Sequence, residues 1–339
     1  MYDSLGSLTS AFGVPGHEGE IRKAILSNGQ FEYHEVDNFG NLYCHNKAGE
    51  GAPTVLLDAH MDEIGFIVKH IDADGMIYLN PMGGIDPRCM IGNRLMVRGS
   101  EDIVGIVCNT PPHLSTEGKV PDIGDLPLDT GLTKRELEEI IYIGAPVGFL
   151  GKLMRLSGTK VSSKGLDNRA GCLVLCELSK TLAANCNVTY LFSTQEEVGT
   201  RGVEVALKTM DPDLALCVDV TQGNMHFIKS PITRELGSGT IIGTGPNIHP
   251  KIFGSLVEHA KKENIPFSTK AYPKATPTNL RTIQLSGGGV PSGLLAIPLK
   301  YMHTPTEVID INDITSTISL IRAFIDDVDD VIQEGFTFY

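Results

Sequence analysis

The chain has 339 residues, of which 41% are hydrophobic and 20% are charged, so it can bury a sizeable core and is long enough for two domains. Its formal net charge of −13 disfavours nucleic acid and anionic membranes as partners, because both are bound through clustered Lys and Arg. No stretch reaches the roughly 18 uninterrupted apolar residues of a membrane span. The seven scattered cysteines form no disulfide framework and the first residues lack a secretory pattern, so we expect a cytoplasmic protein.

Apolar periodicity predicts an α/β arrangement for the first sixty or so residues. Helices are expected at 1–12 and 17–27, and strands at 31–36, 41–46 and 54–59. After Glu63 the pattern changes to short strands at 64–70, 76–79, 94–98 and 103–108, followed by one helix at 133–142. This change predicts a small β-rich module, a barrel or a sandwich, at 69–159, inserted between two parts of an α/β domain at 1–68 and 160–339.

The α/β alternation returns after Gly165. Helices are expected at 167–183, 201–210 and 249–264, alternating with strands at 188–193, 214–219 and 267–272. Apolar residues from Ile311 to Ile332 recur three and four positions apart, which predicts one long helix whose N-cap is Asp310.

Histidine and acidic residues follow several of the predicted strands. They are His60 and Asp62 after 54–59, Asp167 after Gly165, Glu196 and Glu197 after 188–193, Asp219 after 214–218, and His303 after 294–301. Taken singly, each acidic residue is more often a solvated loop residue or a helix N-cap. Because strand ends meet at one rim of an α/β sheet, the repetition indicates a shared site. Two histidines and several carboxylates without cysteine suit a hard or borderline divalent cation, which points to a metal hydrolase.

A pair of metal ions needs a bridging carboxylate, terminal ligands and one free carboxylate to move protons. Two such ions can share a hydroxide as the nucleophile and polarise a carbonyl group. Glu196 and Glu197 are adjacent and point apart on an extended chain, so one can bind metal while the other faces the water; the alternative is one buried and one exposed Glu. Asp62 can reach the second ring nitrogen of His60 and orient the ring.

Five segments carry a resemblance to a known family. Residues 13–18, 59–66, 166–171, 194–202 and 301–307 read GVPGHE, AHMDEIGF, LDNRAG, TQEEVGTRG and YMHTPTE. With these motifs the chain resembles the tetrahedral aminopeptidase family of glutamyl and deblocking aminopeptidases, some of which have been labelled endoglucanases. The resemblance implies a phosphorylase/hydrolase-like three-layer αβα catalytic domain with an inserted β-barrel dimerisation domain. It also implies peptide substrates and dimers that build a homo-oligomer, a tetrahedral dodecamer.

The resemblance also implies the ligands of two divalent ions per subunit, with zinc expected and cobalt or manganese as alternatives. Asp167 would bridge the ions. His60 and Glu197 would complete one ion, and Asp219 and His303 would complete the other.

Two catalytic roles and one backbone feature come from the same resemblance. Glu196 would be the general base and Asp62 the residue that orients His60. The peptide bond between Asp167 and Asn168 would be cis.

One segment departs from the family pattern, and other functions stay open. Residues 275–280 read ATPTNL where the family usually has Gly-Thr-Asp-Ala, so Asn279 replaces an acidic residue expected near the substrate. The absence of Trp and the 6% aromatic content argue against a glycoside hydrolase, which needs stacking platforms. Retention of Glu196 speaks against a noncatalytic metal-stabilised assembly protein. A metal-dependent deacylase or carboxypeptidase on the same scaffold is the closest rival to a metal-dependent aminopeptidase that removes N-terminal residues.

Overall fold

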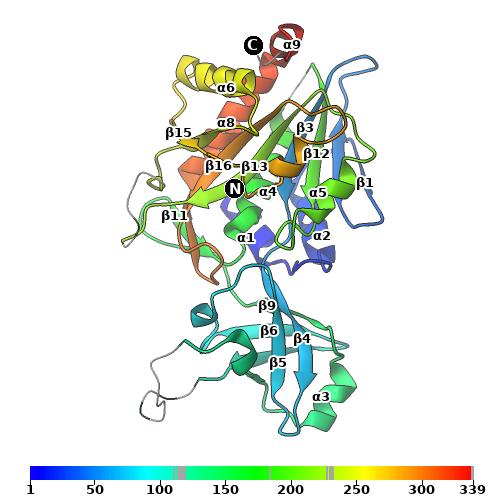
Figure 1. Cartoon of the computed structure of the whole chain (residues 1–339), viewed down its shortest axis with the longest axis vertical. Helices are drawn as coiled ribbons and strands as arrows, with labels where there is room; N and C mark the ends of the chain where they lie inside the picture. The colour runs from blue at the N-terminus through cyan, green and yellow to red at the C-terminus, as the bar shows by residue number, and fades with distance from the viewer. Residues whose placement is uncertain are drawn as a thin grey trace.

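A mixed eight-stranded sheet forms the centre of the larger part of the molecule in the computed structural model, which describes residues 1–109, 111, 113, 120–182, 185–226, 228 and 233–336 (Figure 1). Its strand order is β1 (Tyr33–Val36), β2 (Leu42–Asn46), β12 (Asn187–Ser193), β3 (Thr54–His60), β13 (Leu214–Gln222), β16 (Ser292–Leu299), β14 (Thr240–Thr244) and β15 (Phe267–Ala271). The four central strands β12, β3, β13 and β16 run parallel. Their carboxyl ends therefore lie at one edge of the sheet.

Helices cover both faces of this sheet, because its central strands are apolar on both sides. Along β3, Val55 and Leu57 join one buried cluster while Leu56 joins another. The first cluster packs under α1 (Tyr2–Ser10), α2 (Gly19–Asn28), α4 (Leu166–Thr181), α6 (Pro250–Lys262), α8 (Ile311–Asp326) and α9 (Val328–Gln333). The second cluster packs under the short helices α5 (Arg201–Ala206) and α7 (Leu280–Ile283). No helix among the described residues is both long enough and apolar enough to cross a membrane.

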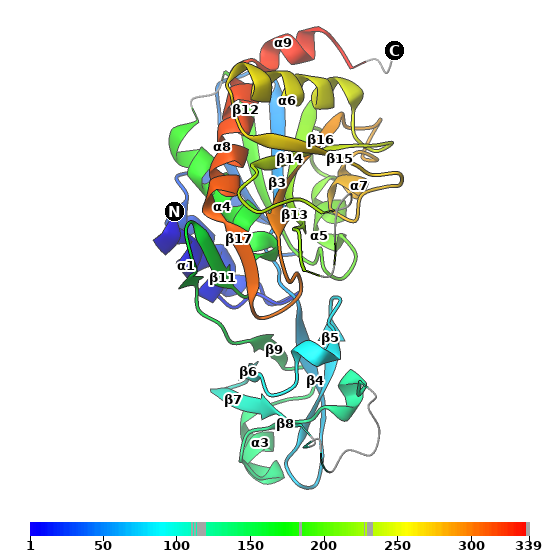
Figure 2. The ribbon, with the colours of Figure 1, turned by 90° about the vertical axis from the view of Figure 1, so that its left-hand side faces the viewer.

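The smaller part is a closed barrel with its own buried core, and it lies at the end of the molecule opposite α9 (Figures 1 and 2). Its strands follow the order β4 (Gly65–Ile71), β5 (Ile77–Met82), β8 (Leu128–Asp129), β7 (Asp102–Val107), β6 (Arg94–Arg98) and β9 (Pro146–Phe149). The short helices η1 (Pro87–Cys89), η2 (Ile123–Asp125) and α3 (Lys134–Ile140) accompany them. Thr133 and Glu136 form a capping box at the start of α3. The predicted β-rich insertion is thus a barrel.

The chain enters and leaves the barrel at slightly different residues from those expected. β4 begins at Gly65, so the barrel includes residues that were assigned to the first part of the larger domain. β10 (Met154–Arg155) pairs with β11 (Lys160–Ser163), which in turn pairs with β17 (Glu307–Asp310). This three-stranded sheet brings the end of the insertion back to the larger part of the molecule.

Several expected elements differ in length from those observed. β13 continues three residues past Asp219 to Gln222 because its pairing with β16 continues to that point. The predicted last helix divides at Asp327 into α8 and α9, and the Asp327 carboxylate lies 3.2 Å from both His259 Nε2 and Lys262 Nζ of α6. α5 ends at Ala206 rather than at 210. Ala183, the expected end of the helix that starts near Asp167, lies outside the described residues.

Candidate metal centre

The carboxyl edge of the central sheet brings together all five residues that the sequence suggested as metal ligands. His60 ends β3, Asp219 lies inside β13, and Glu197 follows β12. Asp167 lies at the start of α4, and His303 lies in the turn after β16. Ligand atoms of His60, Asp167 and Asp219 lie within 4.8 Å of one another, and so do those of Asp167, Glu197 and His303. Both groups contain Asp167.

Asp167 is shared because its two carboxylate oxygens face different histidines. Oδ1 lies 3.2 Å from Nε2 of His60, and Oδ2 lies 3.4 Å from Nε2 of His303. His60 Nε2 is also 3.7 Å from Asp219, and His303 Nε2 is 3.3 Å from Glu197. The expected pairing of His60 with Glu197 and of Asp219 with His303 is therefore wrong. Because Asp219 lies inside β13, directly beside β3, it faces His60.

The site concentrates buried carboxylates. Burial raises the pKa of Glu196 to about 9, and the neighbouring carboxylates of Asp219 and Glu197 act in the same direction. Burial also raises the pKa of Glu197 and of Asp219. Burial opposes ionisation of Asp167 too, but the rings of His303 and His60 lower the pKa of that carboxyl below its usual range. Buried negative charges at this density need compensation, and a set of imidazole and carboxylate donors without thiolates fits divalent cations.

Asp62 ties the two central acidic residues to the site. Its fully buried carboxylate accepts the backbone N–H of Glu196 at 3.0 Å and that of Glu197 at 3.1 Å. The Nδ1–H of His60 donates to the Asp62 carbonyl oxygen at 3.2 Å, and the Asp62 carboxylate lies 3.6 Å from the same nitrogen. These contacts leave Nε2 of His60 facing Asp167 and Asp219.

The peptide bond between Asp167 and Asn168 is cis, as the resemblance led us to expect. Asn168 itself is fully buried and turned away from the ligands. Its side-chain amide donates to the Val218 carbonyl oxygen at 2.8 Å and accepts the Gly171 N–H at 3.0 Å. Its role is to hold the start of α4 against β13.

Sequence reasoning assigned no role to Glu307, although this residue ends the YMHTPTE segment. Glu307 is 2% exposed, and its carboxylate accepts the backbone N–H of Asp167 at 3.1 Å and that of His303 at 2.8 Å. A glutamate four residues after a histidine at a strand end gives no signal of such contacts. The contact with Asp167 also depends on α4, which begins far earlier in the chain.

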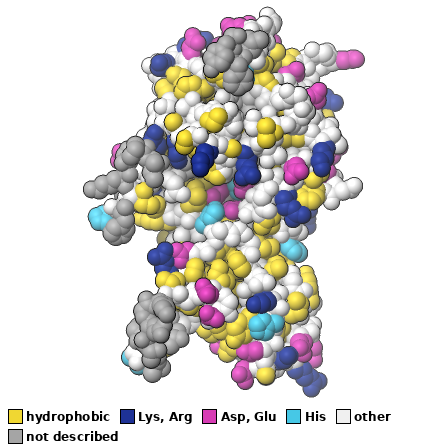
Figure 3. Space-filling model, viewed as in Figure 1, with side chains coloured by type: hydrophobic (Ala, Val, Ile, Leu, Met, Phe, Trp, Pro, Cys, Tyr) yellow, Lys and Arg dark blue, Asp and Glu magenta, His cyan; other side chains and the backbone are white. Residues whose placement is uncertain are grey.

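A cavity of about 290 Å³ opens onto both groups of ligands and onto Glu196. In Figure 3, histidine and acidic side chains gather in the middle of the face, between the sheet and the barrel, with Lys and Arg side chains just above them. Further lining residues are Thr221, Gln222, Lys270, Tyr272, Thr278 and Met302. Lys270 Nζ donates to the Thr221 hydroxyl at 2.6 Å and lies 5.1 Å from the centre of the Tyr272 ring.

Asn279 does not lie at the substrate end of the site, contrary to expectation. Its side chain is buried, and its amide donates to Asp58 at 2.9 Å and to the Ser193 hydroxyl at 2.7 Å. Asp58 is a fully buried residue of β3, and burial raises its pKa to about 6. The contact between residues 58 and 279 therefore contains one carboxylate, that of Asp58, and one amide, that of Asn279.

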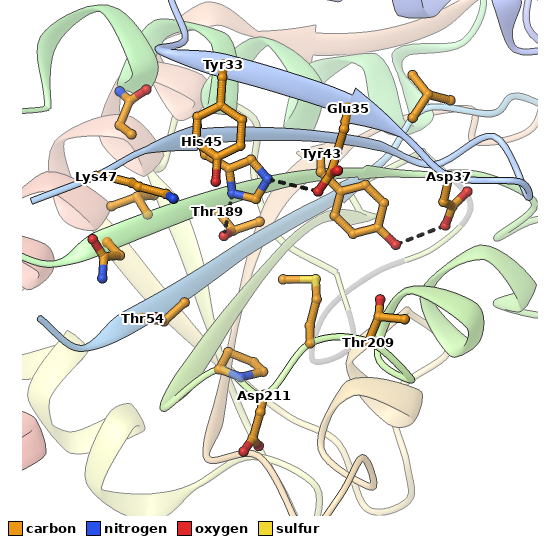
Figure 4. A pocket seen from close by; sticks show the side chains of 16 residues that line it. Tyr33, Glu35, Asp37, Tyr43, His45, Lys47, Thr54, Thr189, Thr209 and Asp211 are labelled. Atoms are coloured by element: carbon orange, nitrogen blue, oxygen red, sulfur yellow. Dashed lines mark hydrogen bonds and ion pairs between the residues drawn. The ribbon is translucent and has the colours of Figure 1, made fainter. Parts of the chain in front are cut away.

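A larger cavity, of about 580 Å³, lies at the outer edge of the sheet beside β1 and β2 (Figure 4). Tyr33 stacks on His45 with ring centres 4.4 Å apart, and His45 Nε2 lies 3.7 Å from Glu35. The Tyr43 hydroxyl donates to Asp37 at 2.9 Å. The residues that line this larger cavity belong to neither group of candidate ligands. The smaller cavity is therefore the candidate active site.

Comparisons with known proteins show which family the chain resembles. The family described as M42 glutamyl aminopeptidase matches residues 40–320. The chain is 33% identical to the lysyl aminopeptidase of Pyrococcus furiosus over 305 residues, which cover 87% of each protein. A solved aminopeptidase from the archaeon Desulfurococcus kamchatkensis matches with a TM-score of 0.92 at 30% identity, covering 98% of this chain and 96% of that one.

A second solved structure is the TET1 peptidase of Pyrococcus horikoshii, described as assembling into a tetrahedron or a large octahedral shell. It matches with a TM-score of 0.84 at 28% identity, covering 95% of this chain and 98% of that one. The family match spans His60 to His303 and thus both groups of candidate ligands. This chain belongs to the M42 glutamyl aminopeptidase family.

Proposed function

We propose that the protein is a metal-dependent aminopeptidase that holds two divalent ions per subunit and removes N-terminal residues from peptides. The observation that carries the proposal is that Asp167 belongs to two groups of donors at once, one completed by His60 and Asp219 and the other by Glu197 and His303. A carboxylate shared between two groups is the arrangement that a pair of ions requires. The donors suit zinc, with cobalt or manganese as alternatives.

Two divalent ions held by Asp167, His60, Asp219, Glu197 and His303 would supply the acidity that activates water and the positive charge that polarises the carbonyl group of the scissile bond. The chain's own residues supply the proton transfers. Glu196 lines the cavity beside both donor groups, and we assign it the role of general base. In this role it takes the proton of the attacking water and passes it to the leaving amine. Glu197, next to it in the chain, serves as a ligand.

Asp62 would act on this chemistry indirectly. Its carboxylate fixes the backbone of Glu196 and Glu197, and its carbonyl oxygen fixes the tautomer of His60. We assign it the role of orienting these three residues rather than of binding metal.

A panel of substrates on metal-stripped and metal-restored protein tests the proposal. Aminoacyl-anilides and peptides with a free amino terminus should be cleaved only by the restored protein. Preferential cleavage of N-acylated substrates would favour a deacylase, and release of carboxyl-terminal residues would favour a carboxypeptidase. No hydrolysis at full metal occupancy would favour a noncatalytic assembly protein.

We also propose that the inserted barrel, expected at 69–159 and beginning with β4 at Gly65, forms a dimerisation domain between the two catalytic parts of the chain. These two parts would together make a three-layer, phosphorylase/hydrolase-like domain. Helices on both faces of the sheet and the closed barrel support this division. By similarity to the tetrahedral peptidase above, the dimers would build a dodecamer. Light scattering that gives the mass of a monomer would contradict the assembly. A cytoplasmic location stays a prediction.

A further inference from the structure

We propose that Glu307 positions two of the metal ligands, Asp167 and His303, through their backbone amides, and that it thereby sets the affinity of the Asp167, Glu197 and His303 group for its ion. The inference rests on the two-ion function proposed above. It gives Glu307, which is not itself a donor, a role in binding at one of the two metal positions.

Glu307 joins two segments of the chain that each carry a candidate metal ligand. Its Oε2 accepts the N–H of Asp167 at the start of α4, and its Oε1 accepts the N–H of His303 in the turn after β16. One carboxylate thus fixes the spacing between the backbones of two ligands. A carboxylate is well suited to this task because each of its oxygens can accept a strong hydrogen bond from an amide.

The backbone of Glu307 is itself fixed independently of the ligands. It is the first residue of β17 and pairs with Ser163 of β11. The next residue, Val308, forms an antiparallel bridge with Lys300. Glu307 can therefore act as an anchor rather than follow the movements of Asp167 and His303.

The turn that carries His303 needs such an anchor. His303 has φ +62° and Tyr301 has φ +59°, and both are in the left-handed region that side chains other than glycine rarely adopt. Besides the contacts of its Nε2 with Asp167 and Glu197, His303 makes two hydrogen bonds: its N–H donates to Glu307, and its Nδ1–H donates to the Gly84 carbonyl oxygen at 2.8 Å. The His303 side chain is part-exposed, with 30% of its surface accessible, so packing alone holds it less firmly than it holds His60, at 3%.

Asp62 offers a parallel on the opposite side of the site, since it takes the N–H groups of Glu196 and Glu197 in the same way. Asp313 offers a matched control away from the site. It is fully buried, and its carboxylate accepts the N–H of Gly237 at 2.8 Å and that of Gly239 at 2.7 Å. Neither glycine belongs to a donor group.

The test is a zinc titration of metal-stripped protein, with the bound zinc counted by elemental analysis and the fold followed by thermal unfolding. Glu307→Gln keeps the size of the side chain but turns an NH₂ group toward one of the two amides. We expect the affinity for one zinc ion to fall by about 10–100-fold, the usual effect of removing a residue that orients a ligand. The affinity for the other ion should fall much less, because Glu307 holds two donors of one group and only the shared Asp167 of the other. Glu307→Asp, which keeps the charge but is too short to reach both amides, should show the same selective loss if Glu307→Gln does not fold. Asp313→Asn should leave both zinc affinities unchanged, whatever its effect on unfolding.

The outcomes separate this inference from the function on which it rests. If the wild-type protein binds fewer than two zinc ions, the two-ion function fails and the inference fails with it. If the wild type binds two and both Glu307 variants bind them with wild-type affinity, the function stands and the inference is overturned. An equal loss of zinc affinity in Asp313→Asn would also overturn it, because Glu307 would then contribute only to general stability.

Discussion

Asp62 and Glu196 are joined by a hydrogen bond of 3.0 Å, in which the Glu196 backbone N–H donates to the Asp62 carboxylate. The same residue, Asp62, contacts the ring of His60 through Nδ1. Glu196 is therefore held in a fixed relation to the first donor group without being part of it. This arrangement suits a group that exchanges protons beside the ions.

Glu196→Gln removes the proton-accepting carboxylate while keeping the size of the side chain. We expect turnover of peptide substrates to fall by about 10²–10⁴-fold, the usual contribution of a general base. Zinc content should stay at the wild-type value, because Glu196 belongs to neither donor group. Glu204→Gln on the exposed side of α5 is the control and should leave the rate unchanged. Wild-type turnover in Glu196→Gln would remove Glu196 from the mechanism.

His303→Ala should empty one metal position. The Asp167, Glu197 and His303 group loses its only imidazole, whereas the His60, Asp167 and Asp219 group keeps all three donors. We expect elemental analysis to find one ion fewer per chain than in the wild type. His34→Ala on the exposed strand β1 is the control and should keep the full metal content. Retention of both ions at wild-type affinity in His303→Ala would show that this group is not a metal site.

Within the described part of the chain, Lys270 is the one Lys or Arg side chain that lines the candidate active site. A cation there favours a substrate whose amino-terminal residue carries a carboxylate. Lys270→Gln should therefore lower kcat/KM for peptides that begin with Glu or Asp by about 10-fold or more, the equivalent of one charge-assisted hydrogen bond. Peptides that begin with Leu are the internal control and should change little. Equal effects on both kinds of peptide would mean that Lys270 does not contact the substrate side chain.

Asn279→Asp would place a second carboxylate against Asp58, because the Asn279 amide donates to Asp58 at 2.9 Å in a fully buried position. We expect the free energy of unfolding to fall by about 3–5 kcal/mol, the range seen when a buried charge is left without compensation. Chemical denaturation measures this change. The exchange Asp58→Asn with Asn279→Asp recreates one carboxylate and one amide, so it should recover much of the loss. Additive losses in the double variant would show that the two residues are not coupled.

The residue types of the candidate site could be predicted from the sequence because a parallel sheet places its strand ends at one edge. Apolar runs before His60, Glu197 and Asp219 were enough to indicate that these residues meet. Their grouping could not be predicted, since it depends on Asp219 lying inside β13 and on the direction in which each oxygen of Asp167 points. The barrel was visible as a change to short strands, whereas its closure depends on pairing between strands far apart in the chain.

Contacts between buried polar residues were the other feature that could not be predicted from the sequence. Their positions in the sequence, next to site motifs, suggest that Glu307 and Asn279 both lie at the edge of the site. The structure places Glu307 under the backbones of Asp167 and His303, and it places Asn279 against Asp58. The contacts of Glu307 with Asp167 and of Asn279 with Asp58 join segments more than a hundred residues apart, and no local pattern in the sequence predicts them.

The most direct test of the account is to strip the protein of metal and then to measure bound zinc and peptide hydrolysis together as zinc is returned. We predict that two ions bind per chain and that cleavage of peptides with a free amino terminus returns as the two sites fill. Full activity in the metal-free protein, or saturation at a single ion per chain, would contradict the claim that Asp167 is shared between two metal positions.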